Sequence, residues 1–189
     1  MNIKPAKNPG GVVVEPRPEE AQLPMPGSDA LPVFNLRKIL VPIDFSECSR
    51  KALCYAIPLA KQFDATLILL KVVEPYFPPA DTMGLDAAVL TEQTRQAAGK
   101  EIAIWVESEI PESLEADSVV RLGNPYEEIV EVAASMHVDL IVLSTHGRTG
   151  LKHAFLGSVA EKVVQHAPCP VLVVRKRERD FFAETDQQP

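Results

Sequence analysis

The segment that follows the most apolar run of the chain combines glycines, a basic residue and a Gly-Ser pair. It reads STHGRTGLKHAFLGS, from Ser144 to Ser158. Glycines directly after a parallel strand let main-chain N–H groups approach an anion closely, and the first N–H groups of a helix have no partner within that helix. Because Gly157-Ser158 opens a helical pattern, these groups and the helix dipole would favour a phosphate. The segment is therefore a candidate phosphate-binding loop, and the Ser158 hydroxyl would also donate a hydrogen bond to the phosphate.

The same residues also have a purely structural interpretation. Gly147 and Gly150 would then only turn the chain, and Ser158 with Glu161 would form an S-x-x-E capping box at the start of a helix. A short glycine-rich loop does not separate these two interpretations, and both stay open at this point.

Two better-known phosphate motifs are absent from the sequence. The Gly-Lys pair at Gly99-Lys100 has Thr94 where a P-loop needs its first glycine and Glu101 where it needs Ser or Thr. The dinucleotide pattern G-x-G-x-x-G fails as well, because Thr145 stands at its first position. A P-loop hydrolase and a dinucleotide dehydrogenase are therefore not supported.

Composition narrows the class of protein further. The chain has 189 residues, 46% of them hydrophobic, which is enough for one domain with a full core. Its formal net charge of -7 argues against a nucleic-acid partner, which needs a basic surface. The three cysteines show no metal or redox spacing, and no signal peptide or apolar run of about 20 residues is present. We therefore expect a cytoplasmic protein with no membrane partner.

The two ends of the chain differ in composition from the middle. Residues 1–35 are rich in proline and glycine and cannot bury enough apolar surface to offset the entropy of ordering, so we expect a disordered tail there. Residues 178–189 are a polar C-terminal tail apart from Phe181 and Phe182. Residues 36–177 remain as the folded domain.

Strand-like and helix-like patterns alternate within this domain. The predicted strands are 37–44, 65–73, 118–122, 140–143 and 171–174, and the predicted helices are 46–63, 85–109, 124–136 and 158–166. Asn124-Pro125 combines a capping residue with a proline suited to the first helical position. Five strands separated by helices imply an α/β fold with a doubly wound, Rossmann-like parallel sheet of five strands.

Such a sheet has a predictable binding edge. Ligands bind beyond the carboxyl ends of the strands, at the point where the strand order reverses. The polar exits of the first and fourth predicted strands, Pro42-Ile43-Asp44 and Ser144 onward, are therefore candidates to flank the site.

Three segments closely resemble the universal stress protein (UspA-like) family. They are KILVPIDFSECSRKAL at 38–53, VDLIVLSTHGRTG at 138–150 and LGSVAEKVVQHAPCPVLVV at 156–174. The resemblance implies a fold of the adenine nucleotide alpha hydrolase-like type that binds ATP, or AMP or ADP, together with Mg²⁺. It also implies a homodimer formed through the last strand, Val171–Val174.

The family pattern of ATP-binding members is G-x-x-G, nine residues, then G-[ST]. Gly147 and Gly157-Ser158 match it, whereas Ser144 replaces the first glycine. A serine there still permits a main-chain contact unless a positive φ is required. By the same resemblance, the adenine and ribose would be lined by Pro42, Ile43 and Asp44, with Val72 and Leu143 against the base, and the phosphate donors would be Gly147, Gly157, Ser158 and Val159. Arg148 follows Gly147 and would either add charge to the phosphates or simply face the solvent.

Asp44 and the histidines each have an alternative role. Asp44 would either accept a hydrogen bond from the exocyclic amine of an adenine or simply cap the helix that follows it. His146 lies in the glycine loop and would be an acid or base only with a partner, so we assign it a structural role. His137, His153 and His166 are expected at the surface.

Three functions remain open from the sequence. The first is a nucleotide-responsive regulator of the stress response, which binds ATP, dimerises and alters a partner. The second, favoured by Ser144, is a stress protein that binds no nucleotide and acts only through protein contacts. The third is a slow ATPase, for which the sequence offers no evident base or metal-binding carboxylate cluster.

Overall fold

The computed structural model describes residues 2–5, 12–15, 34–75, 87–145 and 156–175 and divides the chain into two units, 1–35 and 36–189. In the first unit, β1 (Asn2–Pro5) pairs antiparallel with β2 (Val12–Glu15). This strand pair departs from the expectation of a segment with no regular structure. Two isolated strands are marginally stable at best in water, so a flexible tail stays a prediction.

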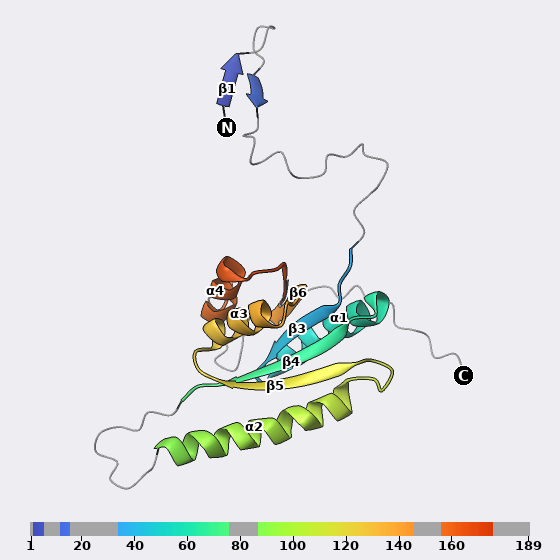
Figure 1. The fold of residues 1–189 in the computed structure, drawn as a ribbon, viewed down its shortest axis with the longest axis vertical. Coiled ribbons are helices and arrows are strands. Elements are labelled where there is room, and N and C mark those ends of the chain that lie inside the picture. Colours follow the sequence, from blue (N-terminus) through green and yellow to red (C-terminus); the bar gives the residue numbers. More distant parts are fainter. Residues whose placement is uncertain (1, 6–11, 16–33, 76–86, 146–155, 176–189) are drawn as a thin grey trace. The chain divides into compact units, whose positions relative to one another are not determined.

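The second unit contains a five-stranded, all-parallel sheet (Figure 1). Its spatial order is β5 (Ala116–Leu122), β4 (Thr66–Val73), β3 (Lys38–Ile43), β6 (Leu140–Ser144) and β7 (Val171–Val174). The chain builds outward from β3 to β5, returns to place β6 on the other side of β3, and then adds β7. The predicted fold class is confirmed, and the strand order reverses between β3 and β6.

Two helices cover each face of this sheet. On one face, α1 (Glu47–Phe63) and α2 (Ala87–Glu109) bury residues such as Leu53 and Trp105 against β3 and β4. On the other face, α3 (Pro125–Ser135) and α4 (Ser158–His166) bury Val132 and Val163 against β3, β4 and β6. Because both faces are covered, the central strands are buried almost without interruption, as in the run from Leu67 to Leu70.

The helix starts of α1 and α3 are stabilised by side-chain caps. The Ser46 hydroxyl accepts a hydrogen bond from the Ser49 N–H at 3.2 Å, and the Asn124 side chain accepts one from the Tyr126 N–H at 3.2 Å. Pro125 occupies the first turn of α3, where its missing N–H costs no intrahelical bond. The predicted start of α3 is therefore confirmed.

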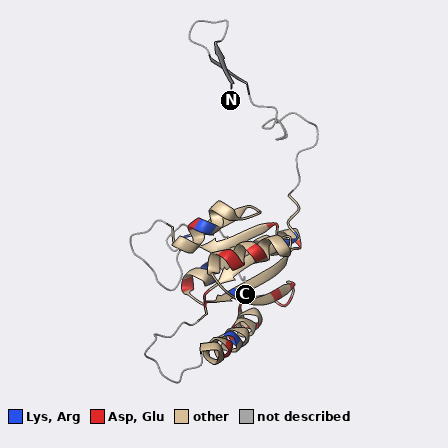
Figure 2. Ribbon diagram, turned by 60° about the vertical axis from the view of Figure 1, so that its left-hand side comes forward, with Lys and Arg blue, Asp and Glu red and all other residues tan. Residues whose placement is uncertain are grey.

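Two surface properties bear on the class of protein. Within the described part of the chain, no helix has both the length and the apolar character that crossing a membrane requires. In the view of Figure 2, acidic and basic positions are scattered over the described helices and strands, and the basic ones form no continuous band.

Candidate functional site

The candidate site lies at the point of the sheet where β3 and β6 are neighbours. Their register comprises Ile39↔Leu140 and Leu40↔Ile141, although both strands continue beyond these pairs. Pro42 lies two residues past the last pair, and a proline has no N–H to donate to a neighbouring strand. The carboxyl ends of β3 and β6 are thus side by side but outside their shared ladder, which is where ligands bind in sheets of this type.

Asp44 follows β3 directly and is held by its own turn. Its Oδ1 accepts hydrogen bonds from the Ser46 N–H at 3.1 Å and from the Ser46 hydroxyl at 2.6 Å. Ser46, rather than Asp44, is the N-cap of α1. The alternative role of Asp44 as a helix cap is therefore wrong, because Asp44 orients the residue that caps the helix.

Phe45 has an unusual backbone that the sequence did not reveal. Its φ is +63°, in the left-handed region that bulky residues rarely adopt. Such a conformation costs about 1–3 kcal/mol and persists only where the surroundings fix it. Here the Phe45 ring meets Trp105 edge-on, with centroids 5.4 Å apart, and the Lys71 ammonium lies 5.1 Å from its centroid.

The start of α4 is joined to the end of β6 by the main chain. The Gly157 N–H donates to the Thr145 carbonyl at 2.7 Å, and the Thr145 N–H donates to the Val174 carbonyl at 3.0 Å. Thr145 is buried and was not among the predicted site residues. It fixes the first turn of α4 against both β6 and β7, so Gly157 and Ser158 lie at the same edge of the sheet as Asp44.

The N-terminus of α4 differs from those of α1 and α3. Its N-cap is Gly157, which makes no side-chain capping bond, and Ser158 is already the first helical residue. The predicted S-x-x-E capping box of Ser158 and Glu161 is therefore wrong, since Ser158 stands one position too late to cap. With no cap side chain over its first N–H groups, α4 presents main-chain donors of the kind that bind anions.

Ser144 does not need to be a glycine in this structure. It is the last residue of β6 and pairs with Val174 on β7 in extended conformation. Any residue adopts such a backbone, so the change from the family glycine imposes no strain here.

The predicted apolar lining is divided between two faces of the sheet. Val72 and Leu143 pack on the face covered by α3 and α4. The Ile43 side chain packs in the core on the opposite face, under α1 and α2. Half-buried Pro42 and Val159 lie at the end of β3 and in the first turn of α4. Gly147 and Arg148 lie outside the described residues.

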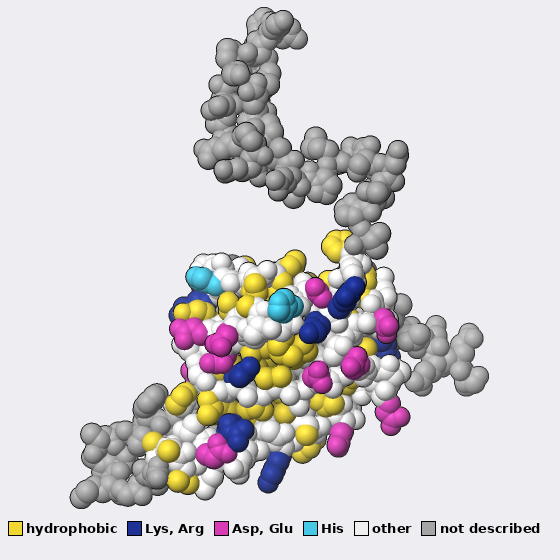
Figure 3. Space-filling view, in the orientation of Figure 1, with side chains coloured by type: hydrophobic (Ala, Val, Ile, Leu, Met, Phe, Trp, Pro, Cys, Tyr) yellow, Lys and Arg dark blue, Asp and Glu magenta, His cyan; other side chains and the backbone are white. Residues whose placement is uncertain are grey.

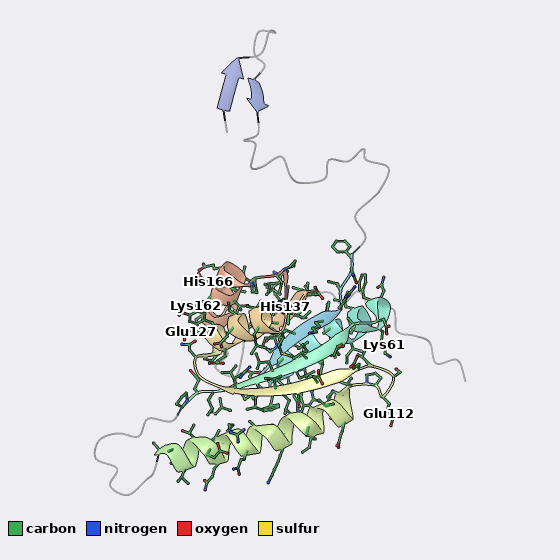
Figure 4. The ribbon with its side chains drawn as sticks, viewed as in Figure 1. Lys61, Glu112, Glu127, His137, Lys162 and His166 are labelled. Atoms are coloured by element: carbon green, nitrogen blue, oxygen red, sulfur yellow. The ribbon has the colours of Figure 1, made fainter. Side chains whose placement is uncertain are left out.

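The described histidines are surface residues, as predicted. His137 follows α3 and His166 ends α4, and both are exposed (Figures 3 and 4). His166 Nδ1 is 2.8 Å from the carbonyl of Lys162, one turn earlier in α4. His146 and His153 lie outside the described residues.

The described residues contain no group of three or more His, Cys, Asp or Glu side chains that would hold a metal ion. Asp44 is the carboxylate at the candidate site, and Ser46 already donates to it. The main-chain donors at the start of α4 would suit the phosphates of a nucleotide.

The cysteines give a test of burial near β6. Cys54 is exposed on α1, whereas burial and the nearby Asp139 raise the pKa of the Cys169 thiol. A raised pKa leaves less thiolate at pH 8, and thiolate is the reactive form. We expect iodoacetamide to label Cys54 several-fold faster than Cys169 in the native protein, as measured by peptide mass spectrometry. Equal native rates would contradict the burial of Cys169, and labelling in denaturant is the control.

Comparison with known proteins identifies the family. A model of the universal stress protein family matches residues 35–175. The universal stress protein MJ0531 of Methanocaldococcus jannaschii is 37% identical over 154 residues, covering 76% of this chain and 85% of the relative. The solved structure of MJ0577, a universal stress protein of the same organism, is 28% identical with a TM-score of 0.67 and covers 77% of this chain and all of its own.

Two more distant structures share the fold with nucleotides present. A universal stress protein in complex with cAMP is 20% identical, with a TM-score of 0.51 over 75% of this chain and 98% of its own. One from Arabidopsis thaliana with AMP bound is 16% identical, with a TM-score of 0.51 over 75% of this chain and 92% of its own. The family match and the parallel sheet agree, and the chain belongs to the universal stress protein family.

Proposed function

We propose that this universal stress protein binds an adenine nucleotide where β3 and β6 end, and that it acts in the cytoplasm as a stress-response regulator. ATP accompanied by Mg²⁺ is the expected ligand, with AMP and ADP as related ones. The proposal is one of binding, and it assigns no catalytic residue.

The observation that carries the proposal is the start of α4. Gly157 caps this helix without a side chain, and its bond to Thr145 holds the first turn at the carboxyl end of β6. An α-helix leaves its first N–H groups without intrahelical acceptors, and the helix dipole favours an anion there. Gly147, Gly157, Ser158 and Val159 would supply donors to the phosphates, and Arg148 would add positive charge.

The other end of the nucleotide would lie against the exit of β3. Asp44 is a carboxylate two residues after Pro42, and a carboxylate accepts hydrogen bonds from an exocyclic amine such as that of adenine. Val72 and Leu143 would pack against the base. The cAMP and AMP complexes of the two distant family structures support an adenine ligand, because both ligands combine that base with a phosphate.

A homodimer through β7 completes the proposal. β7 (Val171–Val174) is an outer strand of the sheet, with β6 on its inner side. The outer edge of a strand presents main-chain groups that pair readily with another chain. Because Val174 also accepts a hydrogen bond from Thr145, the dimer strand and the phosphate end of the site share one main-chain connection.

Thermal unfolding of the nucleotide-stripped protein tests this function. A ligand at about a hundred times its dissociation constant stabilises the folded state by about 2.7 kcal/mol, which for a chain of this size raises Tm by about 5–10 °C. We expect a saturable rise with ATP and Mg²⁺, and a smaller one with AMP. Inorganic triphosphate and CTP are the controls without adenine. No rise in Tm at millimolar ATP would contradict the proposal. An equal rise with inorganic triphosphate would show that the site binds phosphate without recognising adenine.

A further inference from the structure

The turn between β3 and α1 is fixed from two directions. On its polar side, Ser46 donates two hydrogen bonds to the Asp44 carboxylate. On its apolar side, the Phe45 ring packs edge-on against Trp105, at an interplanar angle of 69°. The position of Asp44 therefore depends on both of the residues that follow it.

The left-handed backbone of Phe45 makes the apolar contact important. A bulky residue holds a φ of +63° only where its side chain is fixed by other contacts. If the ring lost its place, the turn would relax toward an ordinary negative φ and carry the adjacent carboxylate with it. Asp44 and Phe45 are neighbours in the chain, so a change of φ at Phe45 changes how β3 leads into α1.

The partner of Phe45 is itself held firmly. Trp105 is 7% exposed and belongs to the core between α1, α2 and the sheet. The Arg50 guanidinium lies 5.2 Å from the centroid of the Trp105 ring and also pairs with Glu109 at 3.6 Å. Trp105 of α2 thus contacts both Phe45 and Arg50 of α1. The turn before α1 therefore packs against a residue of α2.

We propose that Phe45, seated on Trp105, is a positioning residue that holds Asp44 in place to select adenine over bases without its exocyclic amine. This inference rests on the proposed function, because it concerns the base end of the same site. It adds a residue that touches no ligand but determines which base the site accepts. Inosine triphosphate is the appropriate competitor, because it carries an oxygen where adenine carries the amine.

The test is the ratio of ATP to inosine triphosphate affinity, measured by isothermal titration. We expect Phe45→Leu, which keeps an apolar side chain but removes the ring, to lower this ratio on the order of tenfold, the effect of about one hydrogen bond. Phe45→Tyr keeps the ring and should retain the native ratio. Phe63→Leu is the matched control, since Phe63 is also half-buried against the same core but lies at the far end of α1.

A double variant separates positioning from general damage to the fold. In an Asp44→Asn background the ratio should already be low, and adding Phe45→Leu should lower it no further. An unchanged ratio in Phe45→Leu, beside a native protein that prefers ATP, would overturn this inference and leave the proposed function intact. A native protein that binds both nucleotides equally would also overturn it, and one that binds neither would overturn both proposals.

Discussion

A Gly157→Asp variant is expected to fold normally and to lose its response to nucleotide. The φ of -69° and ψ of 152° at Gly157 suit any residue, and aspartate is among the preferred N-cap residues. Its carboxylate would cap the first turn of α4 and gain a few tenths of a kcal/mol over glycine. The same charge would stand where the phosphates are proposed to bind. Like charges about 4 Å apart repel by about 4 kcal/mol near a protein surface, so affinity should fall at least about 100-fold.

Thermal unfolding with and without ATP measures both effects in one experiment. Gly157→Ser is the matched control, because it adds a capping oxygen without a charge and should keep more of the nucleotide response. A Gly157→Asp protein that still gains the native rise in Tm with ATP would show that the phosphates bind elsewhere. A variant that unfolds without ligand would instead contradict the backbone described for this helix start.

Gly123→Ala and Gly99→Ala are expected to change stability in opposite directions. Gly123, between β5 and α3, has a φ of +153°, which L side chains rarely adopt, and an added Cβ would lie 3.0 Å from the Glu128 Cγ. We expect Gly123→Ala to destabilise the domain by about 1–3 kcal/mol. Gly99 lies within α2 with nothing within 4 Å of an added Cβ, so Gly99→Ala should stabilise it by about 0.5–1 kcal/mol.

Denaturant unfolding of both variants gives the two free energies of unfolding. In a Glu128→Ala background, the steric part of the Gly123→Ala cost should disappear and the backbone part should remain. A Gly123→Ala protein as stable as the native one would contradict the positive φ at this turn. Gly99→Ala is the control for the substitution itself, because both variants add one methyl group.

The elements of the folded domain could be predicted because their apolar patterns are strong. The strand and helix patterns at 37–44, 46–63 and 65–73 correspond to β3, α1 and β4 within two residues. β5 begins at Ala116, two residues before the predicted start. Its first residues pair through the main chain at the edge of the sheet, where exposed Asp117 gives no apolar signal. The pairing of β1 with β2 was missed for another reason: the valine cluster at 12–14 stands in a segment whose proline and glycine content predicts disorder.

The sequence was enough to predict at which edge of the sheet the candidate site lies, but not which contacts its residues make. The alternation of strands and helices is enough to place Asp44 and Gly157 at the carboxyl end of the sheet. The capping role of Ser46 had a signal, since a serine directly before a helix is a preferred cap. The left-handed Phe45 had none, because its partner Trp105 is sixty residues away in the chain and propensity argues against the conformation.

The shortest ladder of the five-stranded sheet lies between β3 and β6. β3 pairs with β4 over six positions and β4 with β5 over seven, whereas β3 and β6 share two. Proteins open in parts, along boundaries where the fewest interactions must break. The main-chain pairing of the sheet is therefore weakest between β3 and β6, and the core under α1, which contains Val41 and Val142, holds the two strands together. A ligand that bridged Asp44 after β3 and the first turn of α4 after β6 would link the two strands across this short ladder, and its binding would oppose local opening there.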